Sequence, residues 1–370
     1  MDARRDDPDE VTVDDPPAKD PACDGAAVDV LIAGGGPAGC AAAIVCAAGG
    51  LRTVLVERAD APRDRPGEAL HPGAEALLAR LLPEGFESVV GARHEGITVG
   101  WGSEPRFEPF GSDEDGPWRG FQVDRRRLDG LLLDRARQAG AEVRMSCRVL
   151  EPLVEGGAVT GARTRGPGPG RAAVVRARTV IDATGRARWA SRTLGPTGAG
   201  RARSPRLLIR YGYAVGACPV RDAAPAIVAD HTGWTWTARV GAARYQWMRL
   251  DFVPEQRSRS WLPEEFAGLT PEGPARAADV TWRLCGAAAG PGWFVVGDAG
   301  ALLDPASSHG VLRALLSGWT AGGLTVAVAD GALDPHRAAV TYRRWLYEGA
   351  EHDIHNLAGM YATLGAQGFG

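Results

Sequence analysis

The glycines near the N-terminus are the first residues whose spacing points to chemistry. Gly34, Gly36 and Gly39 form a Gly-x-Gly-x-x-Gly pattern directly after the apolar run Val28–Ile32. Between a strand and a helix, such glycines allow a tight turn, let the backbone approach a pyrophosphate, and leave helix N–H groups free for phosphates. Glu57 follows a second apolar run, where an acid accepts hydrogen bonds from a ribose. A chance triplet is the alternative in a chain with 50 glycines, but the strand and the acid favour a dinucleotide site.

Two later segments place charge at further turns between a strand and a helix. Arg125 follows the apolar run Gly120–Val123 and opens a stretch of helical spacing that ends at Gly140. Gly297 and Asp298 follow another apolar run, and the segment from Asp304 to Val311 then leads into a long apolar helix. We expect these segments to converge with the glycine turn on one ligand.

A few histidines and tryptophans could act on a substrate. His309, beside that last helix, and His71 are the candidate catalytic residues, and ordinary structural histidines are the alternative for both. Trp234 and Trp236 alternate on a predicted strand and so face the same side, where they form either core packing or the aromatic wall of a cavity. Neither the histidines nor the cysteines have the spacing of a metal site.

Alternating helices and strands must position these residues. The pattern predicts strands at 28–32, 53–56, 96–101, 120–123, 142–144, 174–180 and 292–296, a hairpin over 148–165, and helices at 40–48, 73–82, 125–140, 310–329 and 335–364. Several strands rich in aromatic and β-branched residues follow between 207 and 253. We therefore expect an α/β fold with an inserted, mainly antiparallel β subdomain.

Length, composition and charge limit the class of protein. The chain has 370 residues, 45% of them hydrophobic, and a net charge of −3, which suits a globular domain with a large core. Residues 1–27 carry nine acidic residues against three basic ones, and the remainder is mildly basic. The six cysteines show no disulfide or metal spacing. We expect a cytoplasmic protein with no membrane span and no nucleic-acid partner, and leave the oligomeric state open.

The domain boundaries follow from these patterns. Residues 1–26 are predicted to be a disordered acidic tail. The nucleotide-binding domain is expected in two parts, 27–200 and 286–332, which enclose a β-sheet substrate subdomain over 201–285. Residues 333–370 are predicted to form a C-terminal helical segment.

Taken together, the three segments resemble the flavin-dependent monooxygenases of the superfamily that includes p-hydroxybenzoate hydroxylase, geranylgeranyl reductases and tryptophan halogenases. Asp182-Ala183-Thr184-Gly185 resembles the ATG segment of the same superfamily. The resemblance implies a GR2-like FAD-binding fold, with FAD as the dinucleotide. The implied cofactor-binding residues are Gly34, Gly36, Pro37, Ala38, Gly39, Glu57, Arg58, Arg125, Gly297, Asp298, Pro305, Gly310 and Val311. The last three would border the isoalloxazine ring.

Further motifs indicate which members of this superfamily the chain resembles most. Gly67-Glu68 resembles a halogenase and geranylgeranyl reductase segment, and Trp234-Thr235-Trp236 resembles part of the halogenase WxWxIP motif. Halogenases of this type use an active-site lysine, but the only lysine here is Lys19, and His94 stands roughly where that lysine is expected. Glu68, His94, Trp234 and Trp236 are the predicted substrate-pocket residues.

The resemblance is most particular to the flavoproteins that hydroxylate a peptidyl tryptophan during maturation of tryptophylquinone-containing amine dehydrogenases and amino-acid oxidases. It implies hydroxylation of an electron-rich aromatic ring through a flavin C4a-hydroperoxide formed with O2. The substrate would be a small aromatic molecule or a peptide-linked tryptophan, and electrons would come from NAD(P)H or a separate flavin reductase. A geranylgeranyl reductase-type enzyme and a non-catalytic flavoprotein are the alternatives.

Overall fold

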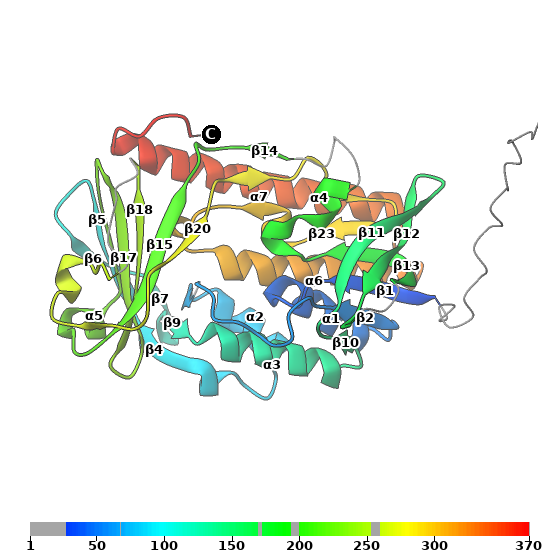
Figure 1. The fold of residues 1–370 in the computed structure, drawn as a ribbon, viewed down its shortest axis with the longest axis horizontal. Coiled ribbons are helices and arrows are strands. Elements are labelled where there is room, and N and C mark those ends of the chain that lie inside the picture. Colours follow the sequence, from blue (N-terminus) through cyan, green and yellow to red (C-terminus); the bar gives the residue numbers. More distant parts are fainter. Residues whose placement is uncertain (1–26, 67, 169–171, 194–199, 253–259, 370) are drawn as a thin grey trace, which may run out of the picture.

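A parallel sheet at one end of the molecule, on the right in Figure 1, carries the glycine turn at the carboxyl ends of its strands. In the computed structural model, which describes residues 27–66, 68–168, 172–193, 200–252 and 260–369, five parallel strands run side by side. Their order is β10 (Glu142–Arg144), β2 (Thr53–Val56), β1 (Val28–Ala33), β13 (Ala173–Asp182) and β23 (Trp293–Val295). The predicted tail 1–26 lies outside the described residues.

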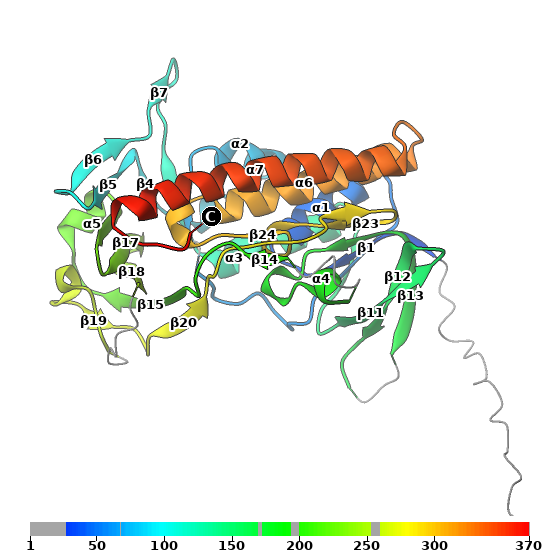
Figure 2. The ribbon, with the colours of Figure 1, turned by 90° about the horizontal axis from the view of Figure 1, so that it is seen from above.

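Helices cover this sheet and bring the glycine turn close to the C-terminal half of the chain. Helix α1 (Pro37–Ala48) packs against both α3 (Arg125–Gln138) and α6 (Gly310–Ala329). A Cβ added at Gly318 of α6 would lie 2.0 Å from the Ala38 carbonyl oxygen, so α1 and α6 can approach this closely only with glycine there. Helix α7 (Pro335–Thr363) runs beside α6 (Figure 2), and the segment predicted as one or two helices is a single helix of 29 residues.

Helix α6 corrects the expectation that no segment is apolar enough to span a membrane. It has 20 residues and a mean hydropathy of 1.4, which pass a test of length and composition, and it is the single such helix in the described chain. Its glycine-lined face packs on α1, and Leu315 and Ala321 belong to the main core. A buried core helix has the same length and composition, so the sequence pattern alone does not distinguish a core helix from a membrane-spanning helix.

A second sheet forms the opposite end of the molecule (Figure 1). Four antiparallel strands make up most of it: β15 (Leu208–Val215), β18 (Arg244–Asp251), β17 (Gly233–Gly241) and β16 (Ala226–Asp230). β5 (Gly96–Trp101) joins β16 in parallel, β6 (Arg106–Pro109) pairs with β5, and β19 (Thr270–Pro271) and β20 (Arg276–Asp279) pair with β15. This sheet therefore takes strands from residues 96–109 as well as from the predicted range 201–285.

Shorter elements connect the two sheets. A small sheet, β3 (Ala69–Leu70), β9 (Gly120–Val123) and β4 (Val90–His94), packs over β17, and α2 (Ala74–Leu81) lies near α6. The hairpin β11 (Arg148–Glu155) and β12 (Ala158–Arg165) extends the parallel sheet through β13. The remaining elements are β7 (Ser112–Asp113), β8 (Gly116–Pro117), β14 (Arg201–Ala202), β21 (Arg283–Leu284), β22 (Ala289–Gly290), β24 (Ala301–Leu302), α4 (Trp189–Thr193) and α5 (Pro219–Ala223). The predicted α/β class with a mainly antiparallel second sheet is confirmed.

Candidate functional site

The three glycines of the turn have different spatial roles. Gly34 has φ +112°, and a Cβ there would lie 2.3 Å from the Ala183 carbonyl oxygen; at Gly39 it would lie 1.9 Å from the Gly34 carbonyl oxygen. Both positions therefore need glycine for the fold itself. A Cβ at Gly36 would meet no atom within 4 Å. The glycine at position 36 is not required by packing, and it keeps open the space that a pyrophosphate would occupy.

The first turn of α1 faces this space with unsatisfied donors. Gly36 is the N-cap residue, and no side chain caps the helix. Pro37 stands at the first helical position, where its missing N–H is not needed. The N–H groups of Ala38 and Gly39 lie in that uncapped first turn. Together with the positive end of the helix dipole, they make a site for an anion.

Glu57 lies at the other side of the turn, after β2. Its carboxylate accepts hydrogen bonds from the Gly35 N–H at 2.7 Å and the Ala59 N–H at 2.8 Å. These bonds fix the carboxylate at the edge of a small cavity that Gly36, Leu133 and Met145 also line. A carboxylate has further lone pairs, so Glu57 can still accept from a ribose hydroxyl. Arg58 is exposed.

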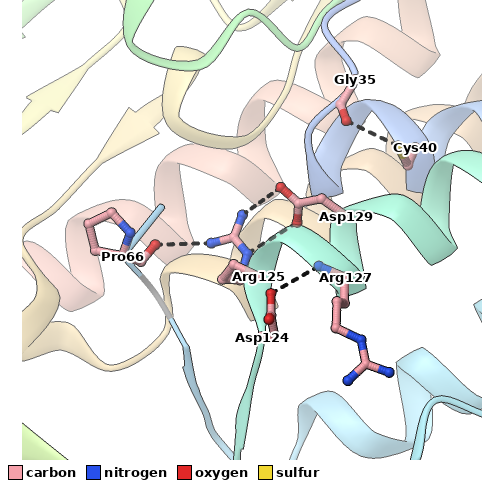
Figure 3. A network of polar contacts seen from close by, with 7 residues as sticks. All are labelled: Gly35, Cys40, Pro66, Asp124, Arg125, Arg127 and Asp129. Carbon is pink, nitrogen blue, oxygen red and sulfur yellow. Dashed lines mark hydrogen bonds and ion pairs between the residues drawn. The ribbon is translucent and has the colours of Figure 1, made fainter. Parts of the chain in front are cut away.

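Arg125 is held rigidly at the start of α3 (Figure 3). Its Nε and Nη2 donate to the two carboxylate oxygens of Asp129 at 3.1 and 3.2 Å, and its Nη1 donates to the Pro66 carbonyl oxygen at 3.1 Å. Burial disfavours the charged guanidinium, but Asp129 outweighs it and raises the pKa of Arg125. The segment before Glu68 is thereby tied to α3.

Asp298 lies within range of the charges of several arginines. Burial raises the pKa of its carboxyl group, and the charges of Arg125, Arg186 and Arg65 act in the opposite direction. Gly297 has φ +61° and donates its N–H to the Ser317 hydroxyl oxygen at 2.8 Å. The end of β23 is therefore fixed against α6, with an acid beside a positive region.

The segment 304–311 is anchored by a buried carboxylate. One oxygen of Asp304 accepts from the Ala306 N–H at 2.8 Å, and the other accepts from the Trp282 indole N–H at 2.5 Å and the Tyr361 hydroxyl at 2.9 Å. Pro305 follows, and Ser308 adopts a left-handed conformation with φ +54°. His309 is the N-cap residue of α6 but its side chain does not cap the helix. The helix start at Gly310 and Val311 therefore offers N–H groups to an electron-rich ring edge.

The three predicted histidines are linked by ring contacts, His94 and His71 through Phe110, and His309 through His71. The rings of His71 and His309 are 5.2 Å apart, and the Phe110 ring lies 5.7 Å from both His71 and His94. Burial lowers the pKa of all three imidazoles, to about 4 for His94 and, with help from the charges of His71 and Arg313, to about 4 for His309. Neutral imidazoles at pH 7 can accept a proton from a substrate.

The low pKa of His94 predicts loss of stability in acid. Its pKa falls from 6.5 in the unfolded chain to about 4 in the fold. Between these two pH values, the unfolded chain therefore binds more protons than the folded chain. Stability therefore decreases as the pH falls through this window, by at most about 3 kcal/mol from this group. Urea unfolding at about pH 7 and about pH 4.5 should show a smaller loss for His94→Gln than for the wild type. Equal losses of stability in His94→Gln and in the wild type would contradict the burial of a neutral His94. His336→Gln, a substitution at an exposed position, serves as the control.

The predicted substrate-pocket residues lie at two places on one face of the second sheet. Glu68 is buried and accepts hydrogen bonds from the Tyr213 hydroxyl and the Gln246 amide; burial raises its pKa. Trp234 is fully buried and donates to the Tyr361 hydroxyl at 2.7 Å, which matches the packing alternative. Trp236 lies two residues further along the same strand face and is 7% exposed.

Comparisons with known proteins fit this arrangement. A family model described as an FAD binding domain matches residues 27–209. The tryptophan 2-halogenase of Chondromyces crocatus is 27% identical over 353 residues, which cover 86% of this chain and 65% of that protein. The chain thus spans slightly less than two thirds of that relative. The digeranylgeranylglycerophospholipid reductase of Thermoplasma volcanium is 26% identical over 320 residues, which cover 78% of this chain and 76% of the reductase.

One more relative and a solved structure complete the comparison. The 6-methylpretetramide 4-monooxygenase of Streptomyces rimosus is 34% identical over 183 residues, which cover 45% of this chain and 40% of that enzyme. The structure of a flavin-dependent brominase superposes with a TM-score of 0.80 at 21% identity, covering 91% of this chain and 88% of the other. The chain is therefore similar to FAD-binding monooxygenases, halogenases and geranylgeranyl reductases, and it shares the fold of the brominase.

FAD is the cofactor, because the FAD binding domain model matches residues 27–209, a range that includes the glycine turn. In this FAD-binding protein, the open space at Gly36 and the uncapped helix α1 would hold the diphosphate, and Glu57 would hold the ribose. Arg125 and Asp298 lie close enough for their charges to interact, and the N–H groups at the start of α6 would face the flavin ring. The individual roles of these residues stay predictions.

Three contacts of the site were missing from the sequence-based prediction. Phe110, which joins the histidines, follows a short edge strand and carries no motif. Tyr213 and Gln246 become partners of Glu68 only because β15 and β18 pair in register. The Asp-Pro pair at 304–305 was a signal for a helix cap, but the bonds of Asp304 with Trp282 and Tyr361 come from distant segments.

Proposed function

We propose that this protein is an FAD-dependent monooxygenase that hydroxylates an electron-rich aromatic ring. The observation that carries the proposal is the pair His71 and His309 beside the start of α6, whose rings lie 5.2 Å apart and whose pKa values are lowered by burial. A neutral imidazole at this place can take the proton that an indole or phenol ring releases when it is oxygenated. Bound FAD, once reduced, would supply the activation of O2.

The face of the second sheet suits an aromatic substrate. Tyr211, Trp236 and Met248 lie in register on neighbouring strands and belong to one apolar cluster. Leu303 and Ala306, from the segment expected at the flavin ring, pack against the same cluster. The protein's contribution would be to hold the ring against the flavin and exclude water.

Unpaired buried polar atoms on β17 and on the neighbouring strand β9 favour a substrate with hydrogen-bonding groups. The indole N–H of Trp236 and both amide atoms of Gln122 are buried without a partner among the described residues. Such atoms are normally paired, so a ligand or water is expected there. A peptide-linked tryptophan or a polar natural-product intermediate would supply these groups.

Halogenation is disfavoured by composition. Several relatives are halogenases, but the single lysine of the sequence is Lys19, and His94 lies near the site instead. Reduction of an alkene is the second candidate, favoured by the match along most of the Thermoplasma volcanium reductase. We further propose a reducing cytoplasmic location, because Cys40, Cys46, Cys147, Cys218 and Cys285 are free and buried.

Product masses after a single turnover separate these reactions. FAD-loaded protein would be photoreduced and mixed with O2 carrying a heavy oxygen isotope, bromide, and in turn free tryptophan, a tryptophan-containing peptide and a phenol. We expect one heavy oxygen atom in the aromatic product. Incorporation of bromide, or addition of two hydrogens without O2, would contradict the proposal.

Substitution of His309 tests its role within that reaction. His309→Ala is expected to lower the rate of oxygen transfer by roughly 10²-fold or more, the usual contribution of a general base. Exposed His336→Ala on α7 is the matched control and should keep the wild-type rate. A wild-type rate in His309→Ala would show that His309 does not act as the general base.

A further inference from the structure

A buried tyrosine of α7, Tyr361, lies within a group of aromatic residues that the proposed reaction does not use. Its ring centroid is 5.5 Å from that of Trp282 and 5.8 Å from that of Trp101, both in edge-to-face geometry. Its hydroxyl oxygen accepts a hydrogen bond from the Trp234 indole N–H at 2.7 Å. Tyr361 and Trp282 are fully buried, whereas Trp101 on β5 is partly exposed. The ring contacts therefore lead from the buried core to a residue that solvent can reach.

The phenol of Tyr361 is hydrogen-bonded to a buried base. Its hydroxyl donates to a carboxylate oxygen of Asp304 at 2.9 Å, and the same carboxylate accepts from the Trp282 indole N–H and the Ala306 N–H. Burial raises the pKa of Asp304 and so makes its carboxylate a stronger base. Burial and the charge of Asp304 raise the pKa of Tyr361, which keeps the phenol neutral. A phenol that loses an electron becomes a strong acid, so this bonded base favours its oxidation.

This pair adjoins the segment expected at the flavin ring. Asp304 belongs to that segment, and the Ala306 N–H donates to it at 2.8 Å. Leu303 and Ala306 pack against the same apolar cluster as Tyr361 and Trp282. The aromatic group therefore begins beside the expected position of the cofactor.

A second buried tyrosine paired with a carboxylate has a different environment. Tyr213 donates to the carboxylate of Glu68, but the guanidinium of Arg244 lies 4.0 Å above the Tyr213 ring. A positive charge so close opposes the removal of an electron from the ring. Tyr361 is therefore the more easily oxidised of the two tyrosines.

We propose that Tyr361 and Trp101 form a relay that carries oxidising equivalents from the flavin site to the protein surface. A one-electron oxidant at the flavin site takes an electron from Tyr361, and the phenolic proton moves to the Asp304 carboxylate. Trp101 then gives an electron to Tyr361, and the proton returns from Asp304. A soluble one-electron reductant restores Trp101. Tyrosine and tryptophan lose an electron at similar potentials, so the contact between their rings permits this transfer. The relay rests on the expected position of the flavin ring and does not require hydroxylation.

A light pulse on the FAD-loaded protein, without O2 or substrate, tests the relay apart from catalysis. Light turns oxidised FAD into a one-electron oxidant, and EPR spectroscopy of protein with ring-deuterated tyrosine identifies a tyrosyl radical. We expect this radical in the wild type and its loss in Tyr361→Phe at equal FAD content. Tyr342→Phe is the matched control and should keep the radical. The Tyr342 hydroxyl is equally buried, but it donates at 2.8 Å to the Val295 carbonyl oxygen, which does not take up a proton.

Trp101→Phe tests the exit to the surface and still decides the matter if Tyr361→Phe does not fold. This variant should form the tyrosyl radical, but ascorbate, added as the soluble reductant, should quench it more slowly than in the wild type. Three results would overturn the inference: no tyrosyl radical in the wild type, a radical retained in Tyr361→Phe, or equally fast quenching in Trp101→Phe. Because the light experiment contains neither O2 nor substrate, it can succeed where oxygen transfer fails, and the reverse.

Discussion

Gly36→Val is expected to abolish FAD binding while the apo-protein keeps its fold. A Cβ at this position meets no protein atom within 4 Å, so the added side chain should cost little stability. It would instead occupy the space that the diphosphate needs, beside the uncapped first turn of α1. We expect an FAD affinity at least about 100-fold weaker, equivalent to roughly 3 kcal/mol. Absorbance after gel filtration measures bound flavin, and thermal unfolding of the apo-protein measures the fold.

Gly39→Val is the matched control with the opposite expectation. Its Cβ would lie 1.9 Å from the Gly34 carbonyl oxygen, so the turn itself must distort. A loss of more than about 4 kcal/mol of stability is expected, before any effect on FAD. Stoichiometric flavin in Gly36→Val would show that the diphosphate does not lie at this turn.

Asp304→Ala should lower the free energy of unfolding by about 3 kcal/mol or more. Asp304 is fully buried and accepts hydrogen bonds from Trp282, Tyr361 and the Ala306 backbone. Removing the carboxylate leaves an indole N–H and a hydroxyl buried without their acceptor, and each such group costs about 1–3 kcal/mol. The Tyr361 hydroxyl also accepts a hydrogen bond from Trp234 at 2.7 Å. The substitution should therefore also weaken the packing of the second sheet against α7.

An exposed aspartate provides the comparison for Asp304. Asp334 caps α7 through the N–H groups of His336 and Arg337 at 2.9 and 3.0 Å. Replacing such an exposed cap by alanine costs about 1 kcal/mol. Urea unfolding of both variants should show Asp304→Ala to be clearly the more damaging. Equal losses would mean that the network around Asp304 does not stabilise the segment 304–311.

Local pattern was sufficient to predict the bounds of several elements in both halves of the molecule. The strands at 53–56, 96–101, 120–123 and 142–144 and the helix at 310–329 have the predicted bounds, because each combines a clear apolar period with a glycine, proline or charged residue at its ends. The first helix starts three residues earlier than predicted, at Pro37, since proline is well accommodated at a helix N-terminus.

Long-range pairing was beyond the reach of local pattern. β5 was predicted as a strand, but its parallel pairing with β16 joins residues more than a hundred positions apart, and no local preference encodes that partner. The same holds for the site. The glycines and Glu57 could be identified from spacing. The contacts of Phe110 with His71 and His94, and of His71 with His309, depend instead on how segments distant in the sequence pack together.

The position of the flavin ring tests the account most directly. A crystal structure of the FAD complex should show the diphosphate at Gly36 and the first turn of α1. The isoalloxazine edge should lie against the N–H groups of Gly310 and Val311, with His309 beside it. A ring placed away from the start of α6, or a protein that binds no FAD, would contradict the account.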